Sequence, residues 1–464
     1  MQAADLTDLS LSEASALVRD RKVSPVALTE ACLARIERHG PALNAFITVT
    51  ADGALARARE AEREVARGAW RGPLHGIPIA LKDLIDTQGV RTTAASGVLE
   101  DRIPERDAPV ARRLADAGAV MLGKLNMHEF AYGGSSVVSR FGPVLNPWSA
   151  AHTPGGSSSG SSVAVAAGLC YGAVGSDTGG SIRQPAAFGN IVGLKPTYGL
   201  VSIRGVIPLS VYNDHVGPMT RTVLDAALML QVMAGYDAED VTSVALAVPE
   251  YAAALGPTVD LRLGVPRTHF QEQMDPDVKV ALERALVVLS ELTVLQREVE
   301  VPAYMDNTVF RAEIYAYHRE TLARTPEKYQ PDTLRRIMTG ADVDAPAYIA
   351  KRREMDELRR SARRLFETVD LLIMPTSPVP AFPVAGLTRS FDELRAAELA
   401  TLRNTRPFNA LGWPAVSVPC GFTAAGLPIG MQIVGPPGGE AVVLALAHAY
   451  QQRTDWHERR PPLD

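Results

Sequence analysis

The stretch PGGSSSGSSVAVAAG, residues 154–168, decides how this chain of 464 residues folds. Its first half places paired glycines before a run of serines, so the backbone can turn tightly there and direct N–H groups toward a bound group. Its second half is small and apolar, which predicts a buried, tightly packed helix over about residues 160–168. Because this helix follows at once, we interpret the glycines and serines as an ordered loop rather than a flexible linker.

A second glycine-rich segment, YGAVGSDTGGSIR at residues 171–183, follows the predicted helix. Its first five residues have the length and apolar character of a strand, which we expect to lead into a loop that presents Ser181. Asp177 and Arg183 flank this loop, and we expect them to pair and support it. Taken alone, Ser181 could also be a helix N-cap, the commoner role for a serine after glycines.

Lys82 ends a third informative segment, GIPIALK at residues 76–82. The apolar run before it has strand length, so Lys82 is expected at the end of a buried strand. Burial penalises the charged form of a lysine and lowers its pKa, which makes Lys82 a candidate base. The alternative is a surface ion pair with Asp83. Together, Lys82, Ser157 and Ser181 predict a base, a proton relay and a nucleophile without a histidine.

Predicted helices and strands alternate along the N-terminal half of the chain. Helices are expected after the Ser24-Pro25 pair and over residues 51–67 and 109–117, and a strand over residues 119–123. This alternation favours an α/β protein in which helices cover both faces of a sheet.

Several segments, in one order along the chain, resemble the amidase signature family, serine hydrolases with a Ser-cisSer-Lys triad. The segments that carry the resemblance are residues 77–83, 123–130, 155–197, 414–421 and 426–430. The resemblance implies an α/β/α sandwich with a large mixed central β-sheet covered by helices. It also implies a single domain over residues 1–464, with a variable, mostly helical region around residues 300–370.

The resemblance implies a role for each residue of the triad. Ser181 would attack the carbonyl carbon of an amide, and Ser157, after a cis peptide bond, would pass the proton to Lys82. The oxyanion hole would be formed by the backbone N–H groups of Thr178, Gly179, Gly180 and Ser181. The expected reaction is hydrolysis of a C–N amide bond through a serine acyl-enzyme. Carbamate, urethane or ester hydrolysis by the same triad is an alternative.

A competing motif lies in the same stretch. Residues 156–160 match G-x-S-x-G, the nucleophile elbow of α/β-hydrolases, with Ser158 as the nucleophile. That motif needs a β-strand directly before it, and residues 150–154 form a poor strand. A non-catalytic binding protein that kept the fold is a further alternative, but the cost of burying a lysine argues against it.

The identity of the amide depends on residues outside the triad. Much of the chain looks like the glutaminase subunit of tRNA-dependent amidotransferases, but residues 312–318 and His128 depart from the pattern of that subunit. Residues 403–409 resemble those of hydrolytic members, so a stand-alone amide hydrolase is favoured and the glutaminase subunit is the alternative. We expect an apolar cleft for the substrate. Candidate lining residues, each of which could equally belong to the core, are Met127, Tyr132, Phe188 and Ile191.

Composition adds expectations about partners and compartment. A net charge of −5 gives no electrostatic reason for nucleic-acid binding. The expected partner is therefore a small-molecule amide, carbamate or ester, with no nucleic acid and no membrane, and a homodimer is left open. The three scattered cysteines lack CxxC spacing and no HxH or HxxxH pattern occurs, so neither a metal nor a cofactor is expected. The N-terminus lacks a signal-peptide pattern, which favours the cytoplasm.

Overall fold

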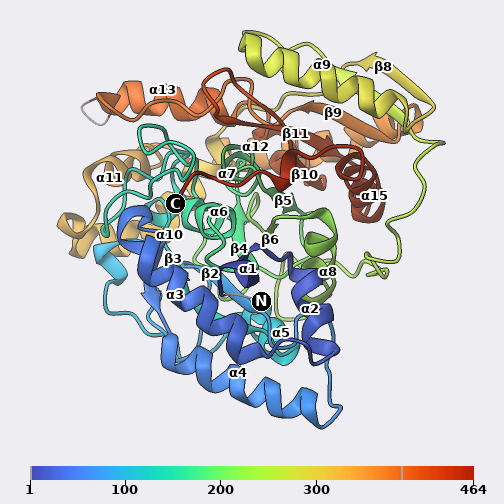
Figure 1. Cartoon of the computed structure of the whole chain (residues 1–464). Helices are drawn as coiled ribbons and strands as arrows, with labels where there is room; N and C mark the ends of the chain where they lie inside the picture. Colours follow the sequence, from blue (N-terminus) through green and yellow to red (C-terminus); the bar gives the residue numbers. More distant parts are fainter. Residues whose placement is uncertain (1–2, 388–389, 464) are drawn as a thin grey trace.

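The computed structural model describes residues 3–387 and 390–463, and its centre is one mixed sheet of eleven strands (Figure 1). From one edge to the other the strands are β1 (Phe46–Val49), β3 (Val120–Leu125), β2 (Pro78–Lys82), β4 (Gly172–Asp177), β6 (His215–Thr220), β5 (Val192–Lys195), β10 (Ala415–Phe422), β11 (Pro428–Val434), β9 (Leu371–Pro375), β7 (Arg262–Pro266) and β8 (Leu295–Val299). Strand β2 runs parallel to β3 and β4, whereas the pairs from β4 through to β9 are antiparallel.

Helices cover both faces of this sheet. Gly172 and Gly175 of β4 are three residues apart, so they point toward opposite faces. A methyl group at Gly172 would lie 2.5 Å from the sulfur of Met229 in α8 (Val223–Met233). One at Gly175 would lie 2.9 Å from Oγ of Ser158, directly before α6 (Ser159–Ala166). The expected α/β/α sandwich with a large mixed sheet is confirmed.

The other α-helices surround the sheet, with α4 at one end of the molecule in Figure 1 and α9 beside β8 at the other. They are α1 (Ala3–Asp8), α2 (Leu11–Arg19), α3 (Pro25–Leu43), α4 (Ala51–Ala66), α5 (Pro109–Asp116), α7 (Arg183–Gly189), α9 (Pro276–Ser290), α10 (Thr308–Arg324), α11 (Pro331–Met338), α12 (Ala345–Ser361), α13 (Phe391–Leu402), α14 (Arg406–Ala410) and α15 (Glu440–Gln451). The helices predicted after Ser24-Pro25 and over residues 51–67 and 109–117 are α3, α4 and α5. The N-cap expected at Ser24 is present, because its side chain accepts a hydrogen bond from the N–H of Ala27 at 3.0 Å.

Helix α6 is buried along its whole length because it is built from small residues. Gly160 is the closest point: a methyl group there would lie 2.4 Å from the carbonyl oxygen of Asn126 and 2.5 Å from that of Ala45. A glycine is therefore required for α6 to approach the chain that leads into β1 and the chain that leaves β3. This approach fixes the serine-rich loop before α6 against the sheet.

The parallel pair β2 and β4 determines where the loops meet. Because adjacent parallel strands end at the same edge of a sheet, the last residues of β2 and β4, Lys82 and Asp177, lie close to each other. The loop from β4 to α7 begins there and carries Ser181. The loop before α6 carries Ser157, so all three predicted triad residues come from segments that converge on this edge.

The region expected to be helical around residues 300–370 contains α10, α11, α12 and a short 3₁₀ segment, Ala362–Glu367. Across residues 3–387 and 390–463, no helix has both the length and the apolar character needed to cross a bilayer. The same residues contain no cluster of three histidine, cysteine or acidic side chains arranged to hold a metal ion.

We expect the substitution Gly160→Ala to lower the free energy of unfolding by about 1–3 kcal/mol, because its methyl group would overlap two carbonyl oxygens. Urea unfolding measures this change. Gly53→Ala in α4 is the matched control: nothing lies within 4 Å of a methyl group there. The free energy of unfolding of Gly53→Ala should rise by a few tenths to about 1 kcal/mol. Equal stability of the two variants would contradict the close packing of α6.

Candidate active site

Lys82 is completely buried, and its amino group is surrounded by hydroxyl groups rather than carboxylates. Its Nζ lies 2.7 Å from Oγ of Ser157, 2.9 Å from Oγ of Ser158 and 2.8 Å from Oγ of Ser176. Desolvation lowers the pKa of Lys82 to about 7, although the charges of two more distant aspartates oppose the shift. A large fraction of this lysine is therefore uncharged at neutral pH.

Asp83 does not neutralise Lys82. Its carboxylate is buried and accepts hydrogen bonds from the backbone N–H of Thr93, at 2.9 Å, and from the hydroxyl of the same residue. The alternative of a surface ion pair between Lys82 and Asp83 is therefore wrong.

Ser157 connects Lys82 to the glycine-rich loop. The peptide bond between Gly156 and Ser157 is cis, and Ser157 has no exposed surface. The N–H of Gly156 donates to Oε1 of Gln184 at 2.8 Å, and the carbonyl oxygen of Ser157 accepts from the N–H of His128 at 3.2 Å. The hydroxyl of Ser157 is thus held beside Lys82 and away from bulk water.

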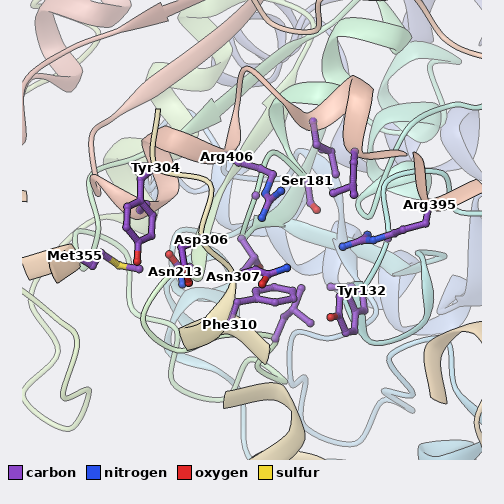
Figure 2. Close-up of a pocket in the computed structure, with 18 residues that line it drawn as sticks. Tyr132, Ser181, Asn213, Tyr304, Asp306, Asn307, Phe310, Met355, Arg395 and Arg406 are labelled. Carbon is purple, nitrogen blue, oxygen red and sulfur yellow. The ribbon is translucent and has the colours of Figure 1, made fainter. Parts of the chain in front are cut away.

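Ser181 lies between β4 and α7 and lines a cavity (Figure 2). Within the described part of the chain its hydroxyl has no hydrogen-bond partner, and it does not bond to Ser157. The hydroxyl is therefore free to meet a substrate. Catalytic hydrogen bonds often form only after a substrate binds, so the absence of a bond between Ser181 and Ser157 here does not exclude a proton relay through Ser157.

Ser158 has neither the setting nor the exposure of a nucleophile elbow. Residues 126–158, which separate β3 from α6 and are all described, contain no strand, so the motif lacks the strand that must precede it. The side chain of Ser158 is buried, bonds to Lys82 and donates to the carbonyl oxygen of Ser176 at 3.1 Å. The elbow interpretation is wrong, because this hydroxyl cannot reach the cavity.

The loop after β4 offers fewer free N–H groups than the sequence suggests. The N–H of Gly180 donates to Oδ1 of Asp177 at 2.7 Å, so it is already used. The N–H groups of Thr178, Gly179 and Ser181 form no such bond to Asp177, and all three residues line the cavity. They are the loop's available donors toward a negatively charged oxygen.

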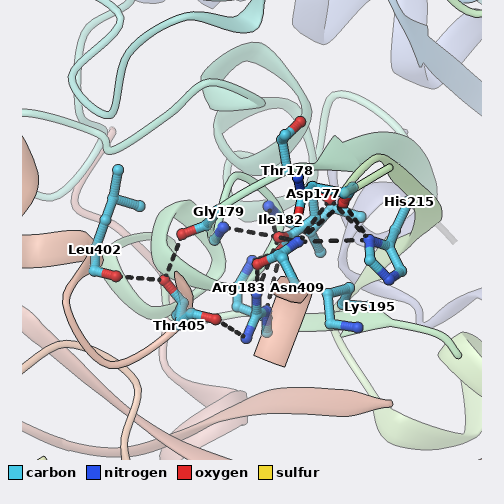
Figure 3. Close-up of polar contacts among 12 residues, drawn as sticks. Asp177, Thr178, Gly179, Ile182, Arg183, Lys195, His215, Leu402, Thr405 and Asn409 are labelled. Carbon is cyan, nitrogen blue, oxygen red and sulfur yellow. Dashed lines mark hydrogen bonds and ion pairs between the residues drawn. The ribbon is translucent and has the colours of Figure 1, made fainter. Parts of the chain in front are cut away.

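A buried ion pair holds this loop in place (Figure 3). Arg183 donates from Nε to Oδ2 of Asp177 at 3.0 Å and from Nη2 to Oδ1 at 2.9 Å. Burial alone would raise the pKa of Asp177, but the Arg183 charge and hydrogen bonds outweigh that effect and hold the pKa well below its ordinary value. Removing one partner of such a buried pair would leave an uncompensated charge.

A distant segment of the chain braces the same loop. Asn409 donates from Nδ2 to the carboxylate and to the carbonyl oxygen of Asp177, each at 2.8 Å. The hydroxyl of Thr405 donates to the carbonyl oxygen of Gly179 at 2.7 Å, and Nη1 of Arg183 donates to the carbonyl oxygen of Thr405 at 3.0 Å (Figure 3). The segment just after α13 therefore sets the position of the loop that carries Ser181.

The lining of the cavity beside Ser181 is mostly apolar, as expected from the sequence, and it also contains three charged side chains. Besides Thr178, Gly179 and Ser181, its lining consists of Ala131, Tyr132, Gly133, Leu209, Asn213, Tyr304, Asp306, Asn307, Phe310, Met355, Arg395, Leu399, Leu402, Arg406 and Ala410. Five of these, from Tyr304 to Met355, belong to the mostly helical region. The two arginines and the aspartate give the cavity charges that no local motif indicated.

Of the four residues predicted to bind substrate, only Tyr132 lines this cavity. Met127, Phe188 and Ile191 are almost completely buried, and Phe188 packs against Ala381. All four adjoin the glycine-rich motifs in sequence, but proximity to a motif does not show whether a side chain points into the core or into the cavity.

The chain is similar in sequence and in structure to known amidases and amidotransferase subunits. The family model described as Amidase matches residues 27–444. A glutamyl-tRNA(Gln) amidotransferase subunit from Geotalea daltonii is 42% identical over 99% of this chain and 100% of the relative. The structure of 6-aminohexanoate cyclic dimer hydrolase complexed with substrate is 29% identical with a TM-score of 0.90, covering 98% and 99% of the two chains. Peptide amidase from Stenotrophomonas maltophilia is 33% identical with a TM-score of 0.84, covering 98% of each.

These relatives correct one expectation. The prediction that the chain acts on a small molecule alone, with no nucleic acid, is wrong, because relatives that match nearly the whole chain are subunits of an amidotransferase named for a tRNA. The prediction rested on a net charge of −5. Net charge describes a whole chain, and it carries no information about a local surface or about contacts that another subunit makes.

The Amidase family model spans Lys82, Ser157 and Ser181, and the relatives match nearly the whole chain. The chain belongs to the amidase signature family and is a hydrolase of C–N amide bonds.

Proposed function

We propose that this chain is the glutamine-hydrolysing subunit of a tRNA-dependent amidotransferase, with Ser181 as its nucleophile. The observation that carries the proposal is the 2.7 Å contact between the buried Lys82 and Ser157, in the same site as a serine that faces a cavity. The relatives named as subunits of glutamyl-tRNA(Gln) amidotransferase support glutamine as the amide and a tRNA-bound acid as the acceptor of its nitrogen.

The departures from the glutaminase subunit affect substrate recognition rather than the triad. Residues 312–318 lie inside α10 and do not line the cavity, although Phe310 at the start of the same helix does. His128 is buried, with its Nδ1 3.8 Å from Oε1 of Glu398. In this proposal, glutamine is therefore held by other residues of the cavity.

In the proposed acylation, Lys82 begins uncharged. It takes the hydroxyl proton of Ser157 while Ser157 takes that of Ser181, and Oγ of Ser181 attacks the carbonyl carbon of the amide. The oxyanion accepts hydrogen bonds from the free N–H groups of the loop, those of Gly179 and Ser181 among them. The relay then returns the proton to the amide nitrogen as the C–N bond breaks, so ammonia leaves and Ser181 carries an ester.

Deacylation uses the same groups in the opposite order. Water gives a proton to the relay and attacks the ester carbonyl, which releases the acid and restores the hydroxyl of Ser181. Because Lys82 and Ser157 have no exposed surface, solvent cannot compete for the proton in transit.

We expect a fluorophosphonate probe to add one adduct to the wild type, detected by intact-protein mass spectrometry, and none to Ser181→Ala. Ser158→Ala is the matched control. It should still be labelled, but more slowly, because it loses one of the three hydroxyls around Lys82. Labelling of Ser181→Ala together with loss of labelling in Ser158→Ala would overturn the assignment of the nucleophile.

The rate of amide hydrolysis should depend on pH through Lys82. Because its pKa is lowered to about 7 and the uncharged form is the base, kcat/KM should be constant above that pH. Below about pH 7 it should fall roughly tenfold per unit as the amino group becomes protonated. A pH–rate profile from pH 5 to 9 tests this expectation, and a profile without a break between pH 6 and 8 would contradict it.

The proposed substrate and assembly are tested together. The purified chain should release ammonia from glutamine, and Ser181→Ala should not. A tagged chain purified from its own cells should carry further protein subunits in native mass spectrometry, and these should increase ammonia release. A chain that purifies alone and cleaves peptide amides but not glutamine would overturn the proposal.

A further inference from the structure

The charged groups that line the cavity leave one positive charge uncompensated. Asp306 lies 3.3 Å from Nζ of Lys351, and Arg395 lies 3.4 Å from Oε2 of Glu398. Within residues 3–387 and 390–463, Arg406 forms no ion pair and no hydrogen bond through its side chain. A guanidinium with no acidic partner, in a largely enclosed site, is costly unless an anion joins it.

Glu398 is not available to supply the missing negative charge. It is completely buried and already accepts from the hydroxyl of Ser135 at 2.6 Å, and it pairs with Arg336 at 2.8 Å as well as with Arg395. The carboxylate of Glu398 thus already pairs with two arginines, Arg336 and Arg395, and is not available to Arg406. Arg406 therefore has no carboxylate of the described chain beside its guanidinium, and a negatively charged group could reach it from the cavity.

Arg406 is also placed where a substrate would contact it. A methyl group at Gly179 would come within 3.3 Å of Cγ of Arg406, so the arginine stem lies against the loop with the free N–H groups. Figure 2 shows the guanidinium groups of Arg406 and Arg395 pointing into the cavity, with Ser181 nearby. The preceding residue, Thr405, holds the same loop through its bond to the carbonyl oxygen of Gly179.

We propose that the substrate carries a carboxylate in addition to its amide, and that Arg406, assisted by Arg395, binds this carboxylate beside Ser181. A guanidinium presents parallel N–H groups that match a carboxylate, which gives direction as well as charge. The inference rests on the proposed function and deepens it, because it names the group by which an amino-acid amide would be oriented. Burial, and then the Arg395 charge, lower the pKa of Arg406 to about 10, so it stays charged at neutral pH.

The test compares two amides of similar length, glutaramate, which has a carboxylate, and valeramide, which has none. Wild type should prefer glutaramate in kcat/KM. Arg406→Gln should reduce that preference about 10- to 100-fold, mainly through KM, because a charge-assisted contact is lost. Arg406→Lys should retain part of the preference, since it keeps the charge without the planar fork.

Arg403→Gln is the matched control, because Arg403 lies three positions away, does not line the cavity and bonds to the carbonyl oxygen of Glu272. It should keep the wild-type preference. A direct measurement on the wild type removes any dependence on the folding of variants: glutarate should slow fluorophosphonate labelling of Ser181, and valeramide at the same concentration should not.

Two results would overturn the inference: an unchanged preference in Arg406→Gln, or equal protection of Ser181 by glutarate and valeramide. These results are distinct from failure of the proposed function. If the chain binds glutarate and prefers glutaramate but releases no ammonia from glutamine, the carboxylate site is supported and only the glutaminase role is wrong. If the probe never labels Ser181, the assignment of the nucleophile is wrong. Calorimetry then still tests the carboxylate site, because it measures whether glutarate binds more weakly to Arg406→Gln than to the wild type.

Discussion

Burial of Lys82 among hydroxyl groups is the constraint on which the rest of the site depends. Its three hydrogen-bond partners in the described chain are serines, so no adjacent carboxylate there holds the proton on the amino group. Desolvation then lowers its pKa to about 7, which supplies a base without a histidine. Removing an amine from water is unfavourable, and the packing of the surrounding core offsets this. The site therefore lies at the end of a fully buried strand.

The fold delivers the other groups to this lysine by a few rigid connections. The parallel pair of β2 and β4 brings two loops to one edge of the sheet, and the glycine in α6 lets the serine loop approach it. The Arg183–Asp177 ion pair and the segment at residues 405–409 then fix the loop of Ser181. The cavity-lining arginine at position 406 belongs to that same bracing segment, so substrate recognition and loop position share one piece of chain.

The parts of this arrangement that local sequence could predict are those carried by short patterns. The glycine pairs, the apolar run before Lys82 and the small residues of α6 each lie within a few positions of the residue they position. The cavity wall could not be predicted in this way: Thr405 meets Gly179 across 226 positions, and no short pattern places Arg395 or Arg406 beside Ser181. The same difficulty arises at short range for Gly180. Its N–H donates to Asp177 only because of the way the loop folds back, which the sequence pattern does not show.

The ionisation of Lys82 in the folded protein tests this account most directly. The chain has only seven lysines, so incorporation of ¹³Cε-lysine should give few signals, and the Lys82→Met variant assigns the one of interest. The account predicts that the Lys82 signal titrates near pH 7, well below the value of about 10.4 for a lysine side chain in a model peptide. A Lys82 signal that shows no titration below about pH 9 would contradict the central claim, because a permanently charged lysine cannot accept the proton of Ser157.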